Sequence, residues 1–262
     1  GYDNFRGIQS EIINSISQGK DTLGLMPTGG GKSVTFQVPA IAMEGVCIVI
    51  TPLIALMKDQ VENLRKRGIK AAAIYSGMTN DQIISTLENC IFGAYKLLYV
   101  SPERLSSTFF LKKISHAHIS FITVDEAHCI TQWGYDFRPS YLKIKDFRKI
   151  FPDTAILALT ATATPAVVED IQRQLDFKCD NVFRMSFLRA NLAYIVEKPI
   201  NRLEKTTQLI ENAKGSCIVY VQTRDDAKNL AEYLNENGQS ATFYHAHLDS
   251  TVKNDRQERW KK

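Results

Sequence analysis

The 262-residue chain has few cysteines, no long apolar run and no strong excess of either charge. Its five cysteines are scattered without a CxxC pair, which argues against a disulfide framework or a zinc site and favours reduced thiols. Its longest apolar stretch, residues 46–57, is shorter than the ~20 residues of a membrane span. Residues 1–6 show no basic-then-apolar leader. We therefore expect an intracellular protein with no membrane partner.

The composition is that of a globular protein. Hydrophobic residues make up 44% and charged residues 23%, which excludes disordered, collagen-like and coiled-coil classes. The formal net charge of +4 is too small to establish a nucleic-acid partner and does not argue against one. At roughly 150 residues per domain, the length indicates one large domain or two modest ones.

Short β-branched runs alternate along the chain with segments of helical period. The runs are apolar along most of their length, as parallel strands buried on both faces are. They predict strands at residues 23–26, 46–51, 97–100, 119–124 and 155–160. Apolar residues at three- and four-residue spacing predict crossover helices at 54–67, 81–92 and 141–150. We predict an α/β domain with a doubly wound parallel sheet, which binds ligands at the carboxyl ends of its strands.

A second series of elements begins near residue 193. The patterns predict strands at 193–196, 217–222 and 241–244, and helices at 203–212 and 225–237. We place one domain at 1–190 and a second unit at 191–262. The second unit has only about 70 residues, which is small for an α/β domain. We therefore expect it to be the first part of a domain, in a chain that is cut short.

The strongest motif is the sequence MPTGGGKS at residues 26–33, between an expected strand and an expected helix. Glycines let the backbone wrap a phosphate, and the helix N-terminus adds its positive dipole end. Lys32 is expected to reach the β- and γ-phosphates of ATP, and the Ser33 hydroxyl to ligate Mg²⁺. The predicted ATP ligands are Thr28, Gly29, Gly30, Gly31, Lys32 and Ser33. The usual motif opens with glycine where this chain has Met26; an incidental glycine-rich turn is disfavoured by the flanking elements.

The acidic sequence DEAH, residues 125–128, follows the apolar run 119–124. Its carboxylates are expected at the same sheet edge as the glycine-rich loop. Asp125 is predicted to hold Mg²⁺ through water, Glu126 to polarise the attacking water, and His128 to link the ATP and strand sites. Two carboxylates beside a nucleotide favour hydrolysis over simple binding. The predicted catalytic residues are Lys32, Ser33, Asp125, Glu126 and His128.

Three expected strand ends carry a Ser-Pro or Thr-Pro pair: Thr51-Pro52, Ser101-Pro102 and Thr164-Pro165. Such pairs begin helices, with the hydroxyl as N-cap and proline at the first position. For Thr164 we favour capping alone. Helix N-termini along one sheet edge can also bind successive phosphates of a nucleic acid. The predicted nucleic-acid ligands in the first two segments are Thr51, Pro52, Lys58, Ser101 and Arg104, although a solvated helix face is the simplest explanation of Lys58.

An aromatic-rich segment follows at residues 129–141. Aromatic rings and guanidinium planes stack on unpaired bases without needing a particular sequence. We predict that Trp133, Phe137 and Arg138 form an exposed nucleic-acid sensor. A packed minicore is the alternative, and Tyr141 fits it best.

Taken in order, these motifs resemble the RecQ family of DNA helicases along nearly the whole chain, including the methionine that opens the glycine-rich loop. By this resemblance Tyr2, Arg6 and Gln9 belong to an adenine-recognition motif. Residues 158–163 resemble the family's motif that couples hydrolysis to strand movement, which assigns coupling roles to Thr160 and Thr162. Residues 217–224 and 244–246 match the start of its second motor domain. His247 departs from the family pattern, which commonly has glycine there.

The resemblance implies an ATP- and Mg²⁺-dependent 3′–5′ DNA helicase with RecA-like domains, active in recombination and repair. It implies single-stranded and partly duplex DNA as partners, in the bacterial cytoplasm or the eukaryotic nucleus. The family's catalytic arginine and zinc subdomain are expected beyond residue 262, so we expect this chain to bind ATP, to lack zinc and to unwind poorly. A phosphate-loop kinase and an ATP-switched annealing or RNA-remodelling module are the alternatives.

Overall fold

The computed structural model describes residues 4–132, 136–188, 191–213 and 215–261. The chain divides into two compact units, Gly1–Arg189 and Ala190–Lys262.

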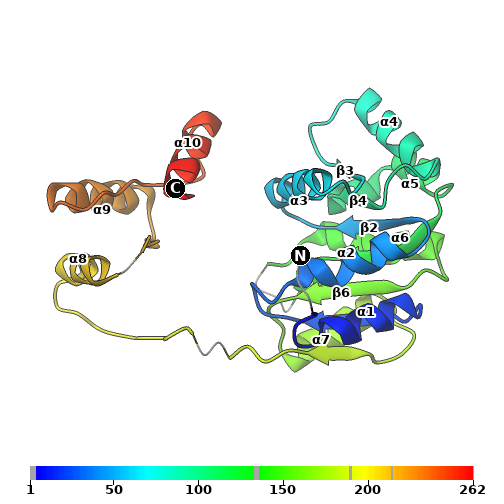
Figure 1. Cartoon of the computed structure of the whole chain (residues 1–262), viewed down its shortest axis with the longest axis horizontal. Helices are drawn as coiled ribbons and strands as arrows, with labels where there is room; N and C mark the ends of the chain where they lie inside the picture. Colours follow the sequence, from blue (N-terminus) through cyan, green and yellow to red (C-terminus); the bar gives the residue numbers. More distant parts are fainter. Residues whose placement is uncertain (1–3, 133–135, 189–190, 214, 262) are drawn as a thin grey trace. The chain divides into compact units, whose positions relative to one another are not determined.

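The first unit is built on a parallel sheet of seven strands in the order β3-β4-β2-β5-β6-β1-β7 (Figure 1). The strands are β1 (Thr22–Leu25), β2 (Val46–Ile50), β3 (Ala71–Ile74), β4 (Leu97–Val100), β5 (Ile119–Val124), β6 (Ile156–Thr160) and β7 (Val182–Arg184). This sheet confirms the predicted α/β class. The five expected strands are present, while the sequence patterns missed β3 and β7. The two missed strands are short, and β3 is mostly alanine, so pairing with β4 rather than local propensity defines it.

Helices cover both faces of the sheet and give it two hydrophobic cores. Within β2, Ile48 and Ile50 belong to one core and Cys47 and Val49 to the other, as the alternation of side chains along a strand requires. The face of the sheet that carries Cys47 and Val49 is covered by α1 (Gln9–Ser17), α2 (Lys32–Ala42) and α3 (Ile54–Lys66).

The opposite face is covered by four helices, α4 (Asn80–Ile91), α5 (Thr108–Ile114), α6 (Lys143–Ile150) and α7 (Pro165–Gln174). Three short 3-10 helices lie between these elements: η1 (Pro102–Ser106), η2 (Ala127–Ile130) and η3 (Pro139–Leu142). The single helix expected at 141–150 is in fact η3 followed by α6, because Pro139 starts a 3-10 turn before the α-helix.

A buried ion pair ties the amino-terminal edge of the sheet together. Asp21, which precedes β1, contacts Arg148 of α6 at 2.6 Å, and both side chains are at least nine-tenths buried. Asp21 also accepts hydrogen bonds from the backbone N–H groups of Ile156 and Lys178, at 2.9 and 3.1 Å. Arg148 donates to the carbonyl of Leu175 at 2.7 Å. The polar atoms of this pair are satisfied, which is the condition under which a buried charge pair is tolerated.

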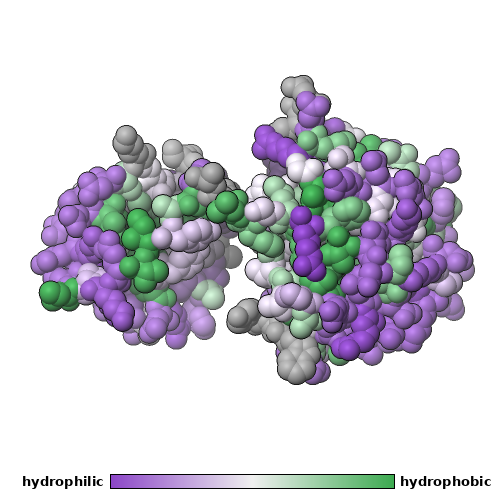
Figure 2. Space-filling model, turned by 90° about the horizontal axis from the view of Figure 1, so that it is seen from below, coloured by the Kyte–Doolittle hydropathy of each residue, from purple (hydrophilic) through white to green (hydrophobic). Residues whose placement is uncertain are grey.

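The second unit contains α8 (Arg202–Asn212), α9 (Arg224–Glu236) and α10 (Ser250–Lys261). The strands expected at 193–196, 217–222 and 241–244 are not formed, since no described residue after Arg184 is in a strand. An apolar run becomes a strand only when a neighbouring strand pairs with it. Val196 and Tyr220 in these runs are more than nine-tenths exposed, and apolar side chains stand among hydrophilic ones on this unit (Figure 2).

Within the described ranges, the helices are all too short or too polar to cross a lipid bilayer.

The Asp21–Arg148 pair gives a test of the packing at the amino-terminal edge. Replacing Asp21 by Asn leaves Arg148 buried without a counter-charge, so we expect Asp21→Asn to lower the free energy of unfolding by about 3–5 kcal/mol. Urea unfolding followed by circular dichroism measures this loss. The matched control is Asp146→Asn, which breaks the exposed pair with Lys149 and should leave the midpoint unchanged. Equal urea midpoints for the two variants would contradict the conclusion that Arg148 depends on Asp21 as its buried counter-charge.

Candidate active site

The side chains singled out by the sequence lie along one edge of the sheet. All seven strands run parallel, so their carboxyl ends meet at the same edge. Backbone hydrogen bonds continue the ladder past the strand ends, from Asp125 N–H to the Ile50 carbonyl at 2.9 Å and from Met26 N–H to the Thr160 carbonyl at 3.1 Å. In spatial order from β3 to β1, the residues at this edge are Tyr75, Ser101, Thr51, Asp125, Thr160 and Met26.

The glycine-rich loop requires glycine at each of its three positions. Gly29 and Gly31 have φ angles of 79° and 80°, in the left-handed region that side chains disfavour. A Cβ at Gly30 would lie 2.9 Å from the carbonyl oxygen of Pro27. α2 begins at Lys32 with no side chain capping its N-terminus. The loop therefore offers backbone N–H groups and a helix dipole, the combination that binds phosphate.

Gln9 of α1 lies against this loop and forms a hydrogen bond to it. Its Nε2 donates to the Gly30 carbonyl at 3.1 Å, and its Oε1 accepts from the Arg6 N–H at 2.8 Å. A Cβ at Gly31 would collide with Gln9 Nε2, so the close approach also explains that glycine. The contact between Gln9 and an adenine edge stays a prediction, as does the role of the exposed Arg6. Tyr2 lies outside the described residues.

Two carboxylates face the loop lysine across the end of β5. Lys32 Nζ lies 3.7 Å from Glu126 Oε1. Burial, and next the nearby charge of Glu126, raise the pKa of Asp125 to about 6, against the smaller opposing effects of Lys32 and of hydrogen bonds from Glu126 N–H and Thr51. One lysine thus faces two carboxylates, and the charge of Glu126 disfavours the ionised form of Asp125. Added positive charge at this point would favour the ionised form of Asp125.

Glu126 is held in a strained backbone conformation. Its φ of 48° is in the left-handed region, unusual for a residue with a Cβ. Its N–H donates to Asp125 Oδ1 at 3.0 Å, and the Tyr141 hydroxyl donates to the Asp125 carbonyl at 2.9 Å. Tyr141 is fully buried, as the minicore alternative for this residue predicts. Its hydroxyl contact is a role that the sequence did not indicate.

A chain of polar contacts leads from the glycine-rich loop to β6. Glu126 Oε2 lies 3.5 Å from His128 Nδ1, and the same nitrogen lies 2.9 Å from Thr160 Oγ1. Thr160 Oγ1 also accepts from the Thr162 N–H at 3.2 Å. The structure therefore brings the predicted coupling residues Thr160 and Thr162 into contact with the acidic motif, through His128.

The Ser/Thr-Pro pairs serve different purposes, and the prediction that the hydroxyl caps a helix is wrong for two of the three. α3 begins at Ile54 with Leu53 as N-cap, and Thr51 instead donates to Asp125 Oδ2 at 3.4 Å. Ser101 precedes the 3-10 helix η1 without capping it by its side chain. Thr164 accepts from the Val167 N–H at 3.4 Å, which confirms capping there. The sequence could not show that the acidic motif would compete for the Thr51 hydroxyl.

Both hydroxyl residues are almost fully buried at the edge. Thr51 is 2% and Ser101 1% exposed, while Pro52 is half-buried and Lys58 exposed. Lys58 Nζ lies 4.6 Å from the ring centre of Tyr75. Contacts of these residues with a nucleic acid stay predictions.

Arg104 reaches the adjacent strand end. Its Nη2 donates to the Tyr75 carbonyl at 2.6 Å, which ties η1 to the segment after β3. Tyr75 was missed from the sequence because β3 was not recognised. An aromatic residue directly after that strand would have been the signal for it.

In the aromatic-rich segment, Arg138 is bound to a neighbouring carboxylate. Its Nε and Nη2 donate to Asp136 Oδ2 at 3.2 and 2.9 Å. This pairing holds the pKa of Asp136 below its usual range. The Cys129 thiol donates to the same oxygen at 3.7 Å, and burial raises its pKa to about 12. Phe137 is half-buried, and Trp133 lies outside the described residues.

The residues at the β1 and β5 ends fit a magnesium-bound nucleoside triphosphate. The three glycines form a cradle for phosphate, and Ser33 lies in the first turn of α2. The pKa of Asp125 is raised because neighbouring positive charge does not compensate its buried, ionised carboxylate. A divalent cation, which prefers oxygen ligands, would supply that charge. Ser33 and Asp125 are therefore the residues that would hold Mg²⁺, directly or through water.

Comparison with known proteins gives matches over nearly the whole chain. The DEAD/DEAH box helicase model matches residues 6–171. The ATP-dependent DNA helicase RecQ of Haemophilus influenzae is 42% identical over 97% of this chain, and that of Bacillus subtilis 43% over 99%. The chain spans 41% and 44% of the length of these two relatives. The matches confirm the predicted resemblance to the RecQ family.

A solved structure gives the same fold at lower sequence identity. The Mycobacterium smegmatis helicase Lhr, in a structure with ssDNA and AMP-PNP, is 19% identical, with a TM-score of 0.67 over 98% of this chain and 38% of that one. At this identity the likeness concerns the fold alone.

The perturbed pKa of Asp125 predicts a pH-dependent stability. Its folded pKa of about 6 lies above the ordinary value of 3.8, so the folded chain binds more protons than the unfolded chain between these values. The free energy of unfolding therefore falls as pH rises through this range. Asp125→Asn should remove that fall and raise the stability of the nucleotide-free chain by about 1–3 kcal/mol near pH 8, with a smaller gain near pH 5.

Urea unfolding at the two pH values measures the effect. Asp153→Asn, a change at an exposed loop carboxylate, is the control and should leave both values unchanged. A loss of stability in Asp125→Asn near pH 8 would contradict the conclusion that the ionised Asp125 carboxylate destabilises the folded chain.

Proposed function

The chain belongs to the DEAD/DEAH box helicase family, and we propose that it carries the nucleotide-binding motor of a RecQ-type ATP-dependent DNA helicase. The observation that carries the proposal is the convergence of the glycine-rich loop, Lys32 and the Asp125–Glu126 pair at one edge of the sheet. RecQ relatives that match over nearly the whole chain support DNA as the substrate. By analogy with that family, we propose 3′–5′ movement on single-stranded DNA and unwinding of partly duplex DNA in recombination and repair.

Hydrolysis is assigned to residues of the first unit. The glycine-rich loop and Lys32 bind the β- and γ-phosphates, and Ser33 and Asp125 hold Mg²⁺, which neutralises charge on the phosphate oxygens. Glu126 orients the attacking water and accepts its proton. Glu126 contacts both Lys32 and His128, which supports this role.

Coupling to DNA is assigned to the chain of contacts from Glu126 to β6. His128 contacts both Glu126 and Thr160, so a change at the γ-phosphate reaches Thr160 and Thr162 through two contacts. The nucleic acid is proposed to follow the β2, β4 and β3 ends. Its proposed ligands there and in the aromatic-rich segment are Thr51, Pro52, Lys58, Ser101, Arg104, Trp133, Phe137 and Arg138.

We assign the second unit to the start of a second RecA-like domain, supported by its exposed apolar runs, which a completed sheet would bury. Related nucleotide hydrolases gain about 10³–10⁵ in rate from an arginine supplied across the cleft. We propose that the 262 residues alone bind ATP and unwind DNA poorly. The site of action is where cellular DNA lies, the bacterial cytoplasm or the eukaryotic nucleus.

Glu126→Gln tests the hydrolytic assignment. The substitution keeps the size of the side chain and removes its ability to accept a proton, so ATP turnover should fall by about 10²–10⁴-fold while ATP binding persists. Lys32→Ala should weaken ATP binding itself. Single-turnover hydrolysis and equilibrium binding of a fluorescent ATP analogue measure the two effects.

Glu62→Gln, a change on the exposed face of α3, is the control. Unchanged turnover in Glu126→Gln would refute the mechanism. Turnover that single-stranded DNA does not stimulate would favour a kinase, a preference for RNA would favour a remodelling module, and rapid strand separation by the chain alone would refute the proposed need for further residues.

Lys58→Gln tests the proposed strand path. Removal of one phosphate contact should weaken single-stranded DNA binding and reduce the slope of log affinity against log salt by about 0.7–1. Fluorescence anisotropy over a salt series measures the slope. Lys66→Gln is a matched control, because Lys66 lies at the other end of the same helix and is paired with Glu62. The same slope change in both variants would place the DNA elsewhere.

A further inference from the structure

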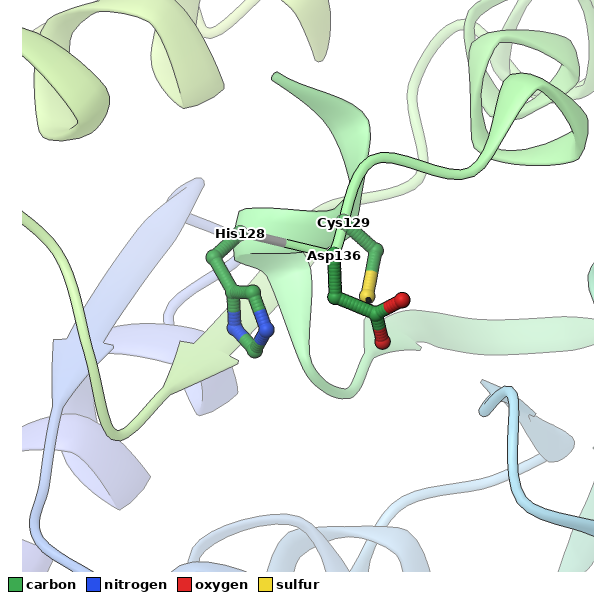
Figure 3. A group of neighbouring side chains, drawn as sticks. All are labelled: His128, Cys129 and Asp136. Carbon is green, nitrogen blue, oxygen red and sulfur yellow. Dashed lines mark hydrogen bonds between the residues drawn. The ribbon is translucent and has the colours of Figure 1, made fainter. Parts of the chain in front are cut away.

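We propose that His128, Cys129 and Asp136 form a binding site for a zinc ion, separate from the magnesium ligands, through which zinc restrains the motor. One ligand atom from each of the three residues lies within 4.8 Å of the others. His128 and Cys129 are adjacent in η2, and the Cys129 sulfur lies beside the Asp136 carboxylate (Figure 3). The site departs from the expectation of no zinc, which rested on the scattered cysteines and on a family zinc subdomain expected beyond residue 262.

The donor set selects the class of ion. An imidazole nitrogen, a thiolate and a carboxylate together suit Zn²⁺, whereas Mg²⁺ prefers oxygen ligands alone. Zinc bonds of about 2.0–2.3 Å bring ligand atoms to roughly 3–4 Å from one another, so the three groups need to close by only about 1 Å. Three protein ligands leave the fourth tetrahedral position to water.

Each residue has a ligand atom available without breaking the sheet. His128 Nδ1 is occupied by Thr160, so Nε2 is the nitrogen assigned to zinc. The Cys129 thiol already points to Asp136 Oδ2, at 3.7 Å, and coordination replaces its proton with the metal. Asp136 has to give up part of its pairing with Arg138, whose two nitrogens contact the same oxygen.

The route into the site lies on the Asp136 side. The side chain of Asp136 is 53% exposed and that of His128 16%, whereas Cys129 is fully buried. An ion therefore meets the carboxylate first and the thiolate last. Without an ion, Cys129 and Asp136 are joined by a hydrogen bond and Asp136 is paired with Arg138, while His128 contacts Glu126 and Thr160.

The effect on the motor follows from the position of His128. This residue contacts Glu126 and Thr160, so a metal bond on its free nitrogen holds the coupling contacts in one arrangement. The same ion takes Asp136 from Arg138, a predicted DNA ligand. We therefore expect zinc to reduce DNA-stimulated ATP turnover. This effect rests on the proposed helicase function, whereas zinc binding does not.

Zinc binding by variants of the whole chain tests the site. Competition with a chromogenic chelator should show one more zinc equivalent bound to wild type than to Cys129→Ser. Asp136→Asn should bind that equivalent at least about tenfold more weakly, since loss even of an outer partner of a metal ligand costs about 10–100-fold. Cobalt(II) added in place of zinc should give a thiolate charge-transfer band in wild type that Cys129→Ser lacks.

Cys179→Ser and Asp146→Asn are the matched controls, an exposed cysteine and an exposed carboxylate paired with a basic side chain, and both should bind zinc as wild type does. Asp136 is exposed, so its variant reports on the site even if Cys129→Ser fails to fold. Equal zinc binding by wild type, Cys129→Ser and Asp136→Asn would overturn the site.

ATP turnover with and without zinc tests the regulatory role. Zinc should inhibit wild type and the two control variants, and Asp136→Asn should be less sensitive. A zinc equivalent that depends on Cys129 but leaves turnover unchanged would overturn the regulatory role. An absence of ATP turnover from the folded wild type would count against the helicase proposal, while the binding comparison would still decide the site.

Discussion

Parallel pairing of seven strands is the constraint on which the rest of this structure depends. Both faces of such a sheet are covered by helices, so polar groups cannot function there without burial cost. The carboxyl ends of the strands form the edge where loops can leave the sheet and keep polar side chains in contact with water. The glycine-rich loop, the acidic motif and the threonines of β6 are consequently neighbours, although up to about 130 residues separate them in the chain.

Acidic side chains outnumber basic ones beside the glycine-rich loop. Lys32 faces two carboxylates, and the burial of Asp125 raises its pKa to about 6. The left-handed backbone at Glu126 stores further strain at the same point. Both costs are tolerated because the sheet and its two hydrophobic cores supply stability elsewhere. A divalent cation beside Asp125 would relieve the electrostatic part of this strain.

His128 is the residue at which the separate parts of the first unit meet. Its Nδ1 contacts Glu126 and Thr160, and its other nitrogen lies on the side of Cys129 and Asp136 in the proposed zinc site. Asp136 in turn pairs with Arg138, and the Tyr141 hydroxyl, which donates to the Asp125 carbonyl, links the aromatic-rich segment to the acidic motif. Nucleotide, DNA and the proposed zinc ion would therefore act on one small set of contacts, and competition among them needs no large movement of the sheet.

The sequence by itself determined the α/β class, five strands and the motifs of the site, because apolar runs and glycine, lysine and carboxylate spacing are local patterns. It could not determine β3, whose alanines become a strand only beside β4. It also could not show that residues 217–222, which lack a pairing partner among the described residues, do not form a strand. Only the tertiary structure shows that the Thr51 hydroxyl donates to Asp125 and that Arg104 donates to the Tyr75 carbonyl. Hydrogen-bond partners distant in sequence are chosen by the packing that brings them together, and no local pattern records that choice.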